Sequence, residues 1–532
     1  MKVKTKFLPE GFLFLAIAIA LFFRAGLMPL SADEPIRALV ALDMLLNKHF
    51  LAPEMNGDLY LNKPPLYNWI LLAFFKLTGS FSEWVIRLPS LLSMLLFVPV
   101  IVKIGRKYTT PQVGWMVALA FITSGNLWFY SSYLGHIDVL FSLVTFLQIY
   151  SIIHYGLRHQ WWSVFVISYS LAAIGFMMKG LPSIAFQGVT LLAFLLVFKR
   201  FKQLFTAAHL SGVIAFTMPI LIYVMAYARQ GDAGALLQNL LNESTSRTIT
   251  DKSLVESVGH IFSFPFLFLA DIMPWGIFAL VFLKRQIRRH IWSSRFLRAC
   301  ITIFLANIVI YWLSPDYRAR YVFMLIPFFL FPIFEAMRLL ISKLNSLIFK
   351  LFAVLSLVLG SAIPFFVHKE LPELSMSPMF VLGILLLAST ILLWKVSDHK
   401  NFKSLYSMVA ILIVFRLIYS SFMVPYRIAT GPYQQEKLKA QELVQTVGQS
   451  RLHMYHSNVS LTMNWYLSAE RRQMVTTKRS DFQLDAFYLV PDDVLIDSNN
   501  VQVFDTFVRR FEHKHFSLVK FKEYFPPMPK KK

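Results

Sequence analysis

Apolar stretches of about 17 to 23 residues recur through the first four-fifths of this 532-residue chain. Helices of that length cross the roughly 30 Å hydrocarbon core of a bilayer with every backbone polar group bonded internally. Only 15% of the residues are charged, whereas soluble domains average about 25%. The sequence therefore predicts an all-α polytopic membrane protein. The thirteen predicted spans are 8–28, 84–102, 112–130, 136–157, 161–178, 182–198, 206–228, 261–283, 297–313, 321–340, 349–367, 378–395 and 404–424.

Charge patterning gives these spans an orientation, because Lys and Arg accumulate in short cytoplasmic loops. With the N-terminus in the cytoplasm, the inside segments hold 22 basic residues and one acid, Asp398. The net charge of +23 is then mostly a topology signal, and no nucleic-acid partner is expected. Thirteen spans place the C-terminus outside, together with loops 30–83 and 229–260.

Two points in this topology stay open. The first span could instead be a signal peptide, with the lysines between residues 2 and 6 as its charged region. The fifth and sixth spans share a break at Lys179-Gly180-Leu181-Pro182 and could be one interrupted segment. Merging them would reverse the orientation of everything downstream.

The composition changes after Pro425, where charged residues become dense and apolar runs shorten. Residues 434–447 have the pattern of an amphipathic helix, and 487–496 contains two short strand-like runs, at its start and at its end. We therefore expect a transmembrane domain over 1–424 and a small soluble α/β domain over 425–532.

The first outside loop begins with two adjacent carboxylates, Asp33 and Glu34, directly after span one. An amphipathic helix is predicted from residue 36 to residue 47. Paired carboxylates at a membrane edge can bind a metal or act as a general base. They could equally be helix-start acids, with Pro35 at the first helical position.

The same loop continues as Tyr60-Leu61-Asn62-Lys63-Pro64-Pro65-Leu66-Tyr67. The consecutive prolines stiffen the backbone and force Lys63 into an extended conformation. A rigidly held lysine suits a fixed anion, such as the phosphate of a lipid. The alternative is a proline-bounded turn in which Lys63 reaches toward the headgroups.

Ionisable residues also occur within the spans. Asp138 lies just inside the outer end of span four, where an ionisable group is a candidate functional residue. Lys179 lies at the matching end of span five, so the two could form an ion pair, either functional or structural. Asp271 and Arg416 sit deeper, and a structural role is expected for both. Arg247 adds a cation to the second long outside loop.

In this order, the residues resemble the polyprenyl-phosphate-sugar-dependent glycosyltransferases of the GT-C fold. Within them the chain is most similar to bacterial lipid A aminoarabinose (4-amino-4-deoxy-L-arabinose) transferase and to protein O-mannosyltransferases. The resemblance covers essentially the whole chain, and the order of the motifs carries it. The matching features are Asp33-Glu34 after span one, the 60–66 run, Asp138, the 178–182 break, Arg247, and Tyr321 before Pro327.

The resemblance implies an inverting transfer of a sugar from an undecaprenyl phosphate carrier to a periplasmic acceptor. The catalytic residues would be Asp33, supported by Glu34, and Asp138, which Lys179 would hold so that it positions the acceptor or orients the active-site floor. The carrier phosphate becomes the leaving group, so positive charge beside it would stabilise charge that develops in the transition state. The phosphate-binding residues would be Lys63, Arg247, Tyr60 and Tyr321.

One position departs from the family. Aminoarabinose transferases carry a glutamate just before the Lys-Pro-Pro run, where it can contribute to a metal site, whereas this chain has Asn62. A neutral amide is a weaker ligand than a carboxylate, which puts both a divalent metal and the aminoarabinose assignment in doubt. Cys300, the single cysteine, excludes an internal disulfide framework and a cysteine-based metal cluster.

The implied acceptor is lipid A or another envelope glycan, and the basic residues Lys252, Arg318 and Arg320 would suit an anionic one. The expected location is the bacterial inner membrane, with the C-terminal domain in the periplasm. Two alternatives stay open, protein O-mannosylation and a lipid or sugar transporter or flippase without transfer chemistry. Transporters often place paired ionisable groups at the midplane of repeated halves, whereas here the charged residues cluster in outside loops.

Overall fold

The computed structural model describes residues 9–245, 254–314, 317–339, 343–396, 403–478, 483–492, 500–509 and 514–522. These residues are mostly helical, and the chain divides into two compact units. The first unit comprises Met1–Ala25, Arg87–Met225 and Ala233–Tyr426, and the second comprises Gly26–Ile86, Ala226–Asp232 and Arg427–Lys532. The first outside loop therefore clusters with the C-terminal segment, which differs from a division at residue 425 alone.

The helices of the first unit follow the predicted spans segment by segment. Eight helices among the described residues are long and apolar enough to cross a membrane, and a pair bent by 51° makes a ninth. The chain is therefore a multi-span membrane protein. These helices are α4 (Glu83–Tyr108), the bent pair of α5 (Pro111–Ile122) and α6 (Gly125–Phe129) with η1 (Ser131–Tyr133), α7 (Ile137–Gly156), α8 (Trp161–Lys179), α10 (Ala207–Tyr227), α14 (Arg295–Trp312), α16 (Lys343–Glu370), α17 (Ser377–Val396), and α18 (Lys403–Ile418) with η6 (Tyr419–Met423) and α19 (Val424–Thr430).

The other four predicted spans contain shorter or interrupted helices. Two of them have 14 and 16 residues, so they are about 21 to 24 Å long against a core of roughly 30 Å. The count of thirteen spans therefore stays a prediction. The four are α1 (Pro9–Phe22), α9 (Pro182–Val197), α12 (Leu254–Asp271) with η3 (Trp275–Leu283), and η4 (Ala319–Tyr321), η5 (Phe323–Leu325) and α15 (Ile326–Leu339). The remaining described helical elements of the first unit are η2 (Phe201–Phe205), α11 (Ala233–Thr245) and α13 (Arg285–Ser293).

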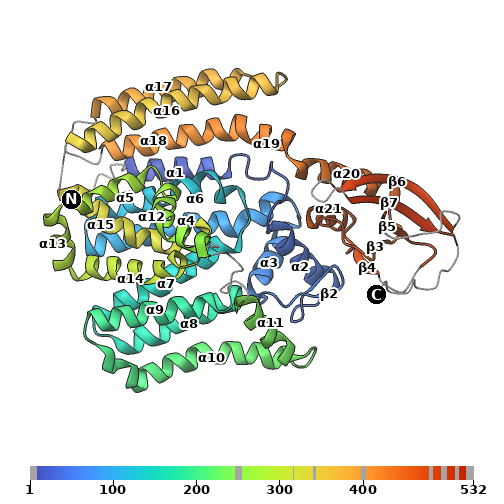
Figure 1. Cartoon of the computed structure of the whole chain (residues 1–532), viewed down its shortest axis with the longest axis horizontal. Helices are drawn as coiled ribbons and strands as arrows, with labels where there is room; N and C mark the ends of the chain where they lie inside the picture. The colour runs from blue at the N-terminus through green and yellow to red at the C-terminus, as the bar shows by residue number, and fades with distance from the viewer. Residues whose placement is uncertain are drawn as a thin grey trace, which may run out of the picture. The chain divides into compact units, whose positions relative to one another are not determined.

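The break between the fifth and sixth predicted spans separates two helices. α8 ends at Lys179, and Gly180 adopts a φ of +81°, which a glycine tolerates without strain. α9 begins at Pro182, whose fixed φ suits the first helical turn. α8 and α9 pack against each other and against α7, and all three lie side by side in Figure 1.

The turn between α4 and α5 brings two helices into backbone contact. A Cβ atom on Gly105 would clash with the Cα of Gly114, so this approach requires glycine. The hydroxyl of Thr110 caps α5 by accepting a hydrogen bond from the backbone N–H of Val113 at 3.3 Å. Pro111 follows at the start of the helix, where its missing N–H costs nothing.

The C-terminal part of the second unit contains a five-stranded sheet with strand order β4-β3-β5-β7-β6. β3 is parallel to β4 and β5, whereas β7 is antiparallel to β5 and β6. The predicted helix over 434–447 and the first predicted strand of 487–496 are present as α20 and β5, and the second strand lies outside the described residues. The elements are α20 (Pro432–Val447), β3 (Leu452–Tyr455), α21 (Leu461–Arg471), β4 (Thr476–Lys478), β5 (Phe487–Pro491), β6 (Val501–Arg509) and β7 (Lys514–Phe521).

The first outside loop forms the other part of the second unit. Its hairpin turn meets the edge of the sheet, because the backbone carbonyl of Asn56 accepts a hydrogen bond from the N–H of Thr477 at 2.9 Å. The side-chain amide of Asn464 donates to Oδ1 of Asn56 at 2.6 Å. The hydroxyl of Tyr466 accepts from the N–H of Leu30 at 3.0 Å. The elements of the loop are α2 (Glu34–Asn47), β1 (Glu54–Met55), β2 (Asp58–Leu59) and α3 (Leu66–Thr78).

Candidate functional site

The adjacent carboxylates of the first outside loop lie at the start of α2 in the second unit. Glu34 is fully buried, and its Oε2 accepts a hydrogen bond from the backbone N–H of Ser31 at 3.0 Å. Asp33 occupies the N-cap position and is half-buried, but its carboxylate does not cap its own helix. Pro35 follows in the first turn. Glu34 therefore has a local structural contact, while the Asp33 carboxylate is not used in the capping bond that a simple helix-start acid would make.

Tyr60 lies between α2 and α3 rather than on an open surface. Its ring is buried in an apolar cluster with Val40, Met44 and Leu72. The guanidinium of Arg37, one turn beyond Asp33, lies 5.5 Å from the centroid of the Tyr60 ring, within the range of a cation–π contact. The structure thus gives the ring of Tyr60 a packing role, and its proposed hydroxyl contact to a phosphate stays a prediction.

Lys63 lies in the loop that leads into α3. Pro64 and Pro65 are buried, and Pro65 is the N-cap residue of α3. The loop is thus anchored immediately after Lys63, which is half-buried. Asn62 is exposed, and its neutral amide does not suit the metal-binding role of the family glutamate at this position.

Three further predicted residues, Asp138, Lys179 and Tyr321, lie in the first unit, around the buried carboxylate of Asp138. Lys179 Nζ donates to Oδ1 of Asp138, so the predicted ion pair is present. Arg320 Nε lies 3.3 Å from Oδ2 of the same carboxylate. The side chains of Asp138, Lys179 and Arg320 are 5%, 9% and 9% exposed. The expectation that Arg320 serves an anionic acceptor is therefore replaced by a buried contact with Asp138.

The ends of two helices favour this arrangement of charges. Asp138 lies in the first turn of α7, where the helix dipole favours a negative charge. Lys179 is the last residue of α8, where the dipole favours a positive charge. Buried ions are costly unless they are paired, and here one carboxylate faces two cations. The cluster of Asp138, Lys179 and Arg320 thus carries a formal charge of +1 inside the first unit.

Tyr321 extends this cluster. Lys179 Nζ lies 4.5 Å from the centroid of the Tyr321 ring, and the guanidinium carbon of Arg320 lies 5.7 Å from it. The ring of Tyr311 lies 5.9 Å away on a neighbouring helix. Tyr321 is therefore held next to the two cations by a short 3₁₀ turn, η4, that also carries Arg320.

Asp271 has neutral partners. Its two carboxylate oxygens accept hydrogen bonds from the side-chain amide of Asn126 at 3.2 Å and from the hydroxyl of Tyr317 at 2.8 Å. These contacts join three segments of the first unit and agree with the structural role expected for Asp271. Arg247, the last of the predicted phosphate ligands, lies outside the described residues.

Arg416 is fully buried and joins α18 to two other segments. Its Nε donates to the backbone carbonyl of Ala20 at 3.2 Å, and its Nη1 donates to the hydroxyl of Ser132 at 2.6 Å. The rings of Trp128 and Tyr133 lie 4.7 and 4.1 Å from its guanidinium carbon. This arginine therefore has the structural role expected from its depth in span thirteen.

The structure adds two residues whose contacts the sequence did not reveal. Arg320 pairs with Asp138 although the two are 182 positions apart, which no local pattern can indicate. Arg37 is buried on α2 beside Tyr60, and the detectable signal was an arginine on the apolar side of an amphipathic helix. Both arginines lie next to residues that the sequence analysis had singled out.

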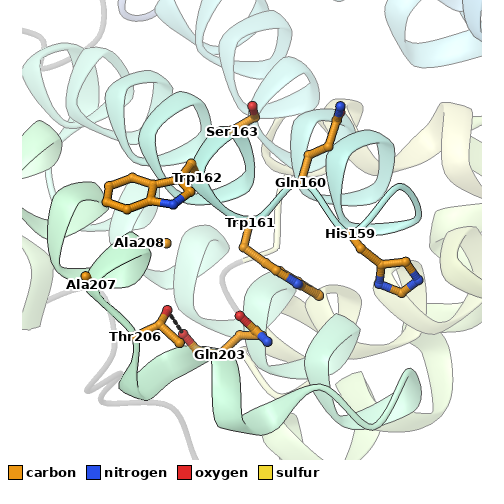
Figure 2. Close-up of a pocket in the computed structure, with 9 residues that line it drawn as sticks. All are labelled: His159, Gln160, Trp161, Trp162, Ser163, Gln203, Thr206, Ala207 and Ala208. Atoms are coloured by element: carbon orange, nitrogen blue, oxygen red, sulfur yellow. Dashed lines mark hydrogen bonds between the residues drawn. The ribbon is translucent and has the colours of Figure 1, made fainter.

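A pocket of about 500 Å³ lies at the turn between α7 and α8, and no predicted site residue lines it. In the predicted topology this turn faces the cytoplasm, whereas the predicted site residues lie on the outside face. Trp162 is largely exposed there, as is common for tryptophans at a membrane–water interface. Figure 2 shows the lining residues, which are His159, Gln160, Trp161, Trp162, Ser163, Gln203, Thr206, Ala207 and Ala208.

A known protein family matches part of the sequence. The model of the dolichyl-phosphate-mannose-protein mannosyltransferase family matches residues 62–227, a segment that contains Lys63, Asp138 and Lys179. The undecaprenyl phosphate-alpha-4-amino-4-deoxy-L-arabinose arabinosyl transferase of Pseudomonas savastanoi pv. phaseolicola is 26% identical over 212 residues. That match covers 38% of this chain and only 39% of the relative.

Solved structures extend the similarity to nearly the whole chain. ArnT from Cupriavidus metallidurans in the apo state superimposes with a TM-score of 0.70 and 16% identity, covering 96% of this chain and 98% of that one. The same protein bound to undecaprenyl phosphate gives a TM-score of 0.68, also at 16% identity, covering 96% of this chain and 97% of that one. The chain therefore has the ArnT fold, which confirms the predicted helical GT-C architecture with a small C-terminal sheet domain.

Proposed function

We propose that this protein is a membrane glycosyltransferase that moves a sugar, with inversion, from an undecaprenyl or related polyprenyl phosphate carrier to a periplasmic acceptor. The main support is the fold match over 96% of the chain to ArnT, including the structure bound to undecaprenyl phosphate. The mannosyltransferase family model adds support over the segment that contains Lys63, Asp138 and Lys179.

In the proposed reaction, an acceptor oxygen attacks the anomeric carbon on the face opposite the carrier. The bond between that carbon and the phosphate oxygen breaks, and its electron pair leaves with the phosphate. Lys63, Arg247, Tyr60 and Tyr321 stabilise the charge that develops on this leaving group. Where the acceptor oxygen carries a proton, Asp33 takes it, and otherwise Asp33 orients the acceptor. Glu34 supports Asp33 by fixing the first turn of α2 through its bond to Ser31.

Asp138 is proposed to act in the same reaction from the first unit, where Lys179 and Arg320 hold its carboxylate. The paired carboxylate is rigid because both of its oxygens face a cation. A fixed dipole costs no reorganisation when charge moves during the reaction. Lys179 and Arg320 are therefore positioning residues, and Tyr321 beside them adds a hydroxyl donor for the phosphate.

The acceptor is proposed to be lipid A or another envelope glycan. Of the three basic residues expected to suit an anionic acceptor, Arg320 is paired with Asp138 and Lys252 lies outside the described residues. The third, Arg318, is exposed and supports an anionic acceptor. Protein O-mannosylation is the second candidate, because the matching family model describes protein mannosyltransferases. The fold and the donor class are the same for both candidates, and the acceptor distinguishes them.

We further propose that the protein lies in the bacterial inner membrane, with its N-terminus in the cytoplasm and its C-terminal domain in the periplasm. The support is the excess of basic residues in the predicted inside segments. A reporter fused after Lys532 should be active outside the cytoplasm. A cytoplasmic signal would mean that the number of spans has the wrong parity.

The function is tested by mass spectrometry of lipid A, other envelope glycans and glycoproteins from cells with and without the protein. Loss of a sugar from lipid A or a glycan supports the leading proposal, and loss from a protein supports the second. Purified protein in vesicles should then transfer sugar from a labelled undecaprenyl-phosphate donor to that acceptor. Movement of the labelled donor across the vesicle membrane without a covalent product would favour a flippase instead.

A further inference from the structure

Three potential metal ligands meet at the C-terminal end of α2, away from the proposed catalytic carboxylates. They are Asp43 on α2, His49 just beyond it, and Glu54 at the start of β1. One ligand atom from each residue lies within 4.8 Å of the others. The helix ends at Asn47, and Lys48 adopts a left-handed conformation with φ of 64°, which turns the chain so that His49 lies beside Asp43.

The separations of the ligand atoms suit a shared ion. Nδ1 of His49 lies 3.6 Å from Oδ2 of Asp43 and 3.3 Å from Oε1 of Glu54. Two ligands bound at about 2.0 to 2.1 Å with tetrahedral angles would be about 3.3 to 3.4 Å apart. An ion placed between these atoms would therefore reach them with little movement of the backbone.

The unsatisfied atoms point to a ligand rather than to a direct bond between the residues. Asp43 is almost fully buried, yet its Oδ2 has no hydrogen-bond partner among the described residues, and neither does the buried Nδ1 of His49. A buried polar atom without a partner is costly. Oδ1 of Asp43 accepts a hydrogen bond from the side-chain amide of Asn47 at 2.7 Å, which turns Oδ2 toward His49. Asn47 therefore orients the Asp43 carboxylate in the way that an outer partner orients a metal ligand.

We propose that Asp43, His49 and Glu54 bind one divalent transition-metal ion of the Zn²⁺ class. One imidazole nitrogen with two carboxylate oxygens is a mixed ligand set that Zn²⁺ accepts, whereas Mg²⁺ and Ca²⁺ take oxygen ligands. Three protein ligands leave a fourth position for water, which the half-exposed ring of His49 makes accessible.

The proposed ion has a structural role. Asp43 lies nine positions after Glu34 on α2, about 14 Å along the helix, so the ion is too far from Asp33 and Glu34 to take part in the chemistry. It would fasten the C-terminal end of α2 to β1, whose hairpin turn carries Asn56. The helix that carries Asp33 and Glu34 at one end would thus be fixed at the other.

The test uses the full-length chain, purified in detergent with an affinity tag that contains no histidine. The protein is incubated with Zn²⁺ alone, passed through gel filtration, and analysed for zinc by elemental mass spectrometry. We expect about one zinc per wild-type chain and a loss of most of it in His49→Gln. His456→Gln is the matched control, because His456 is an exposed histidine of the same unit, and it should keep the wild-type amount.

Two further variants keep the proposal falsifiable if His49→Gln folds poorly. Glu54→Gln should also lose most of the zinc, and Asn47→Ala should lower the affinity by about 10- to 100-fold because it removes only the outer partner. A wild-type chain without zinc, equal loading of wild type and Glu54→Gln, or displacement of zinc by millimolar Mg²⁺ would each overturn the proposal. Because no sugar donor is present, the result is independent of the proposed transfer activity.

Discussion

Asp138→Asn removes the negative charge that two buried cations share. The formal charge of the cluster with Lys179 and Arg320 rises from +1 to +2, in a place where the side chains are 5%, 9% and 9% exposed. Removing one partner of a buried ion pair typically costs about 3 to 5 kcal/mol, because the other charge is left without compensation. We expect a loss of that size in the free energy of unfolding.

Two comparison variants test the electrostatic cause. Lys179→Met lowers the charge of the cluster to zero and leaves Asp138 paired with Arg320, so it should cost less than Asp138→Asn. The double variant should be more stable than the sum of the single effects predicts, with a coupling of about 0.5 to 3 kcal/mol. Asp271→Asn is the matched control, because Asp271 has the neutral partners Asn126 and Tyr317, and it should cost at most about 1 kcal/mol.

The measurement is unfolding of the purified chain in mixed micelles with increasing denaturing detergent, followed by tryptophan fluorescence. Circular dichroism before the titration confirms that each variant has the wild-type helix content. The reasoning would be refuted if Asp138→Asn unfolded within about 1 kcal/mol of wild type. It would also be refuted if Asp271→Asn were as destabilising as Asp138→Asn, since burial of the side chain alone would then explain both.

Three further predictions concern single residues. Asp33→Asn should abolish sugar transfer in vesicles while the unfolding midpoint stays near that of wild type, because the carboxylate does not cap α2; activity within a few-fold of wild type would remove Asp33 from the catalytic role. Lys63→Ala should raise the donor concentration needed for half-maximal transfer, and an unchanged donor dependence would contradict the phosphate contact. Burial lowers the pKa of His453 from 6.5 to about 4, so the folded sheet binds fewer protons than the unfolded chain and should lose stability as pH falls from about 6.5 to about 4. His453→Gln should flatten that part of the pH profile of sheet unfolding, and an equally steep profile in the variant would exclude His453 as its source.

Much of the first unit could be predicted from local sequence, because a membrane span needs only length and apolarity. The break between α8 and α9 could also be predicted from local sequence, because Gly180 and Pro182 act on the backbone at their own positions. The pair of Asp138 and Lys179 followed from placing both at the outer ends of consecutive spans. The number of spans did not follow as securely, because the 14 residues of α1 and the 16 of α9 are shorter than the apolar stretches around them.

What the sequence could not provide were contacts between distant segments. Arg320 is separated from Asp138 by a large part of the chain, and its sequence neighbours indicated only a basic residue near an outside loop. The unit formed by the first outside loop and the C-terminal segment was missed for the same reason. The cluster of Asp43, His49 and Glu54 is local, but it depends on the left-handed turn at Lys48, which the sequence pattern did not indicate.

The pairing of the hairpin with the sheet edge has a consequence for how the protein is made. Asn56 and its partner Asn464 are 408 positions apart. At a synthesis rate of about 5 to 20 residues per second, roughly 20 to 80 s pass between the appearance of the two on the ribosome. In the proposed topology this loop is translocated during that time, while its polar groups still lack their final partners. Ribosomes that stall or terminate after α19 would release a chain whose spans can insert but whose Asn56 lacks its partners on α21 and β4, which makes that product a natural target for membrane quality-control proteases.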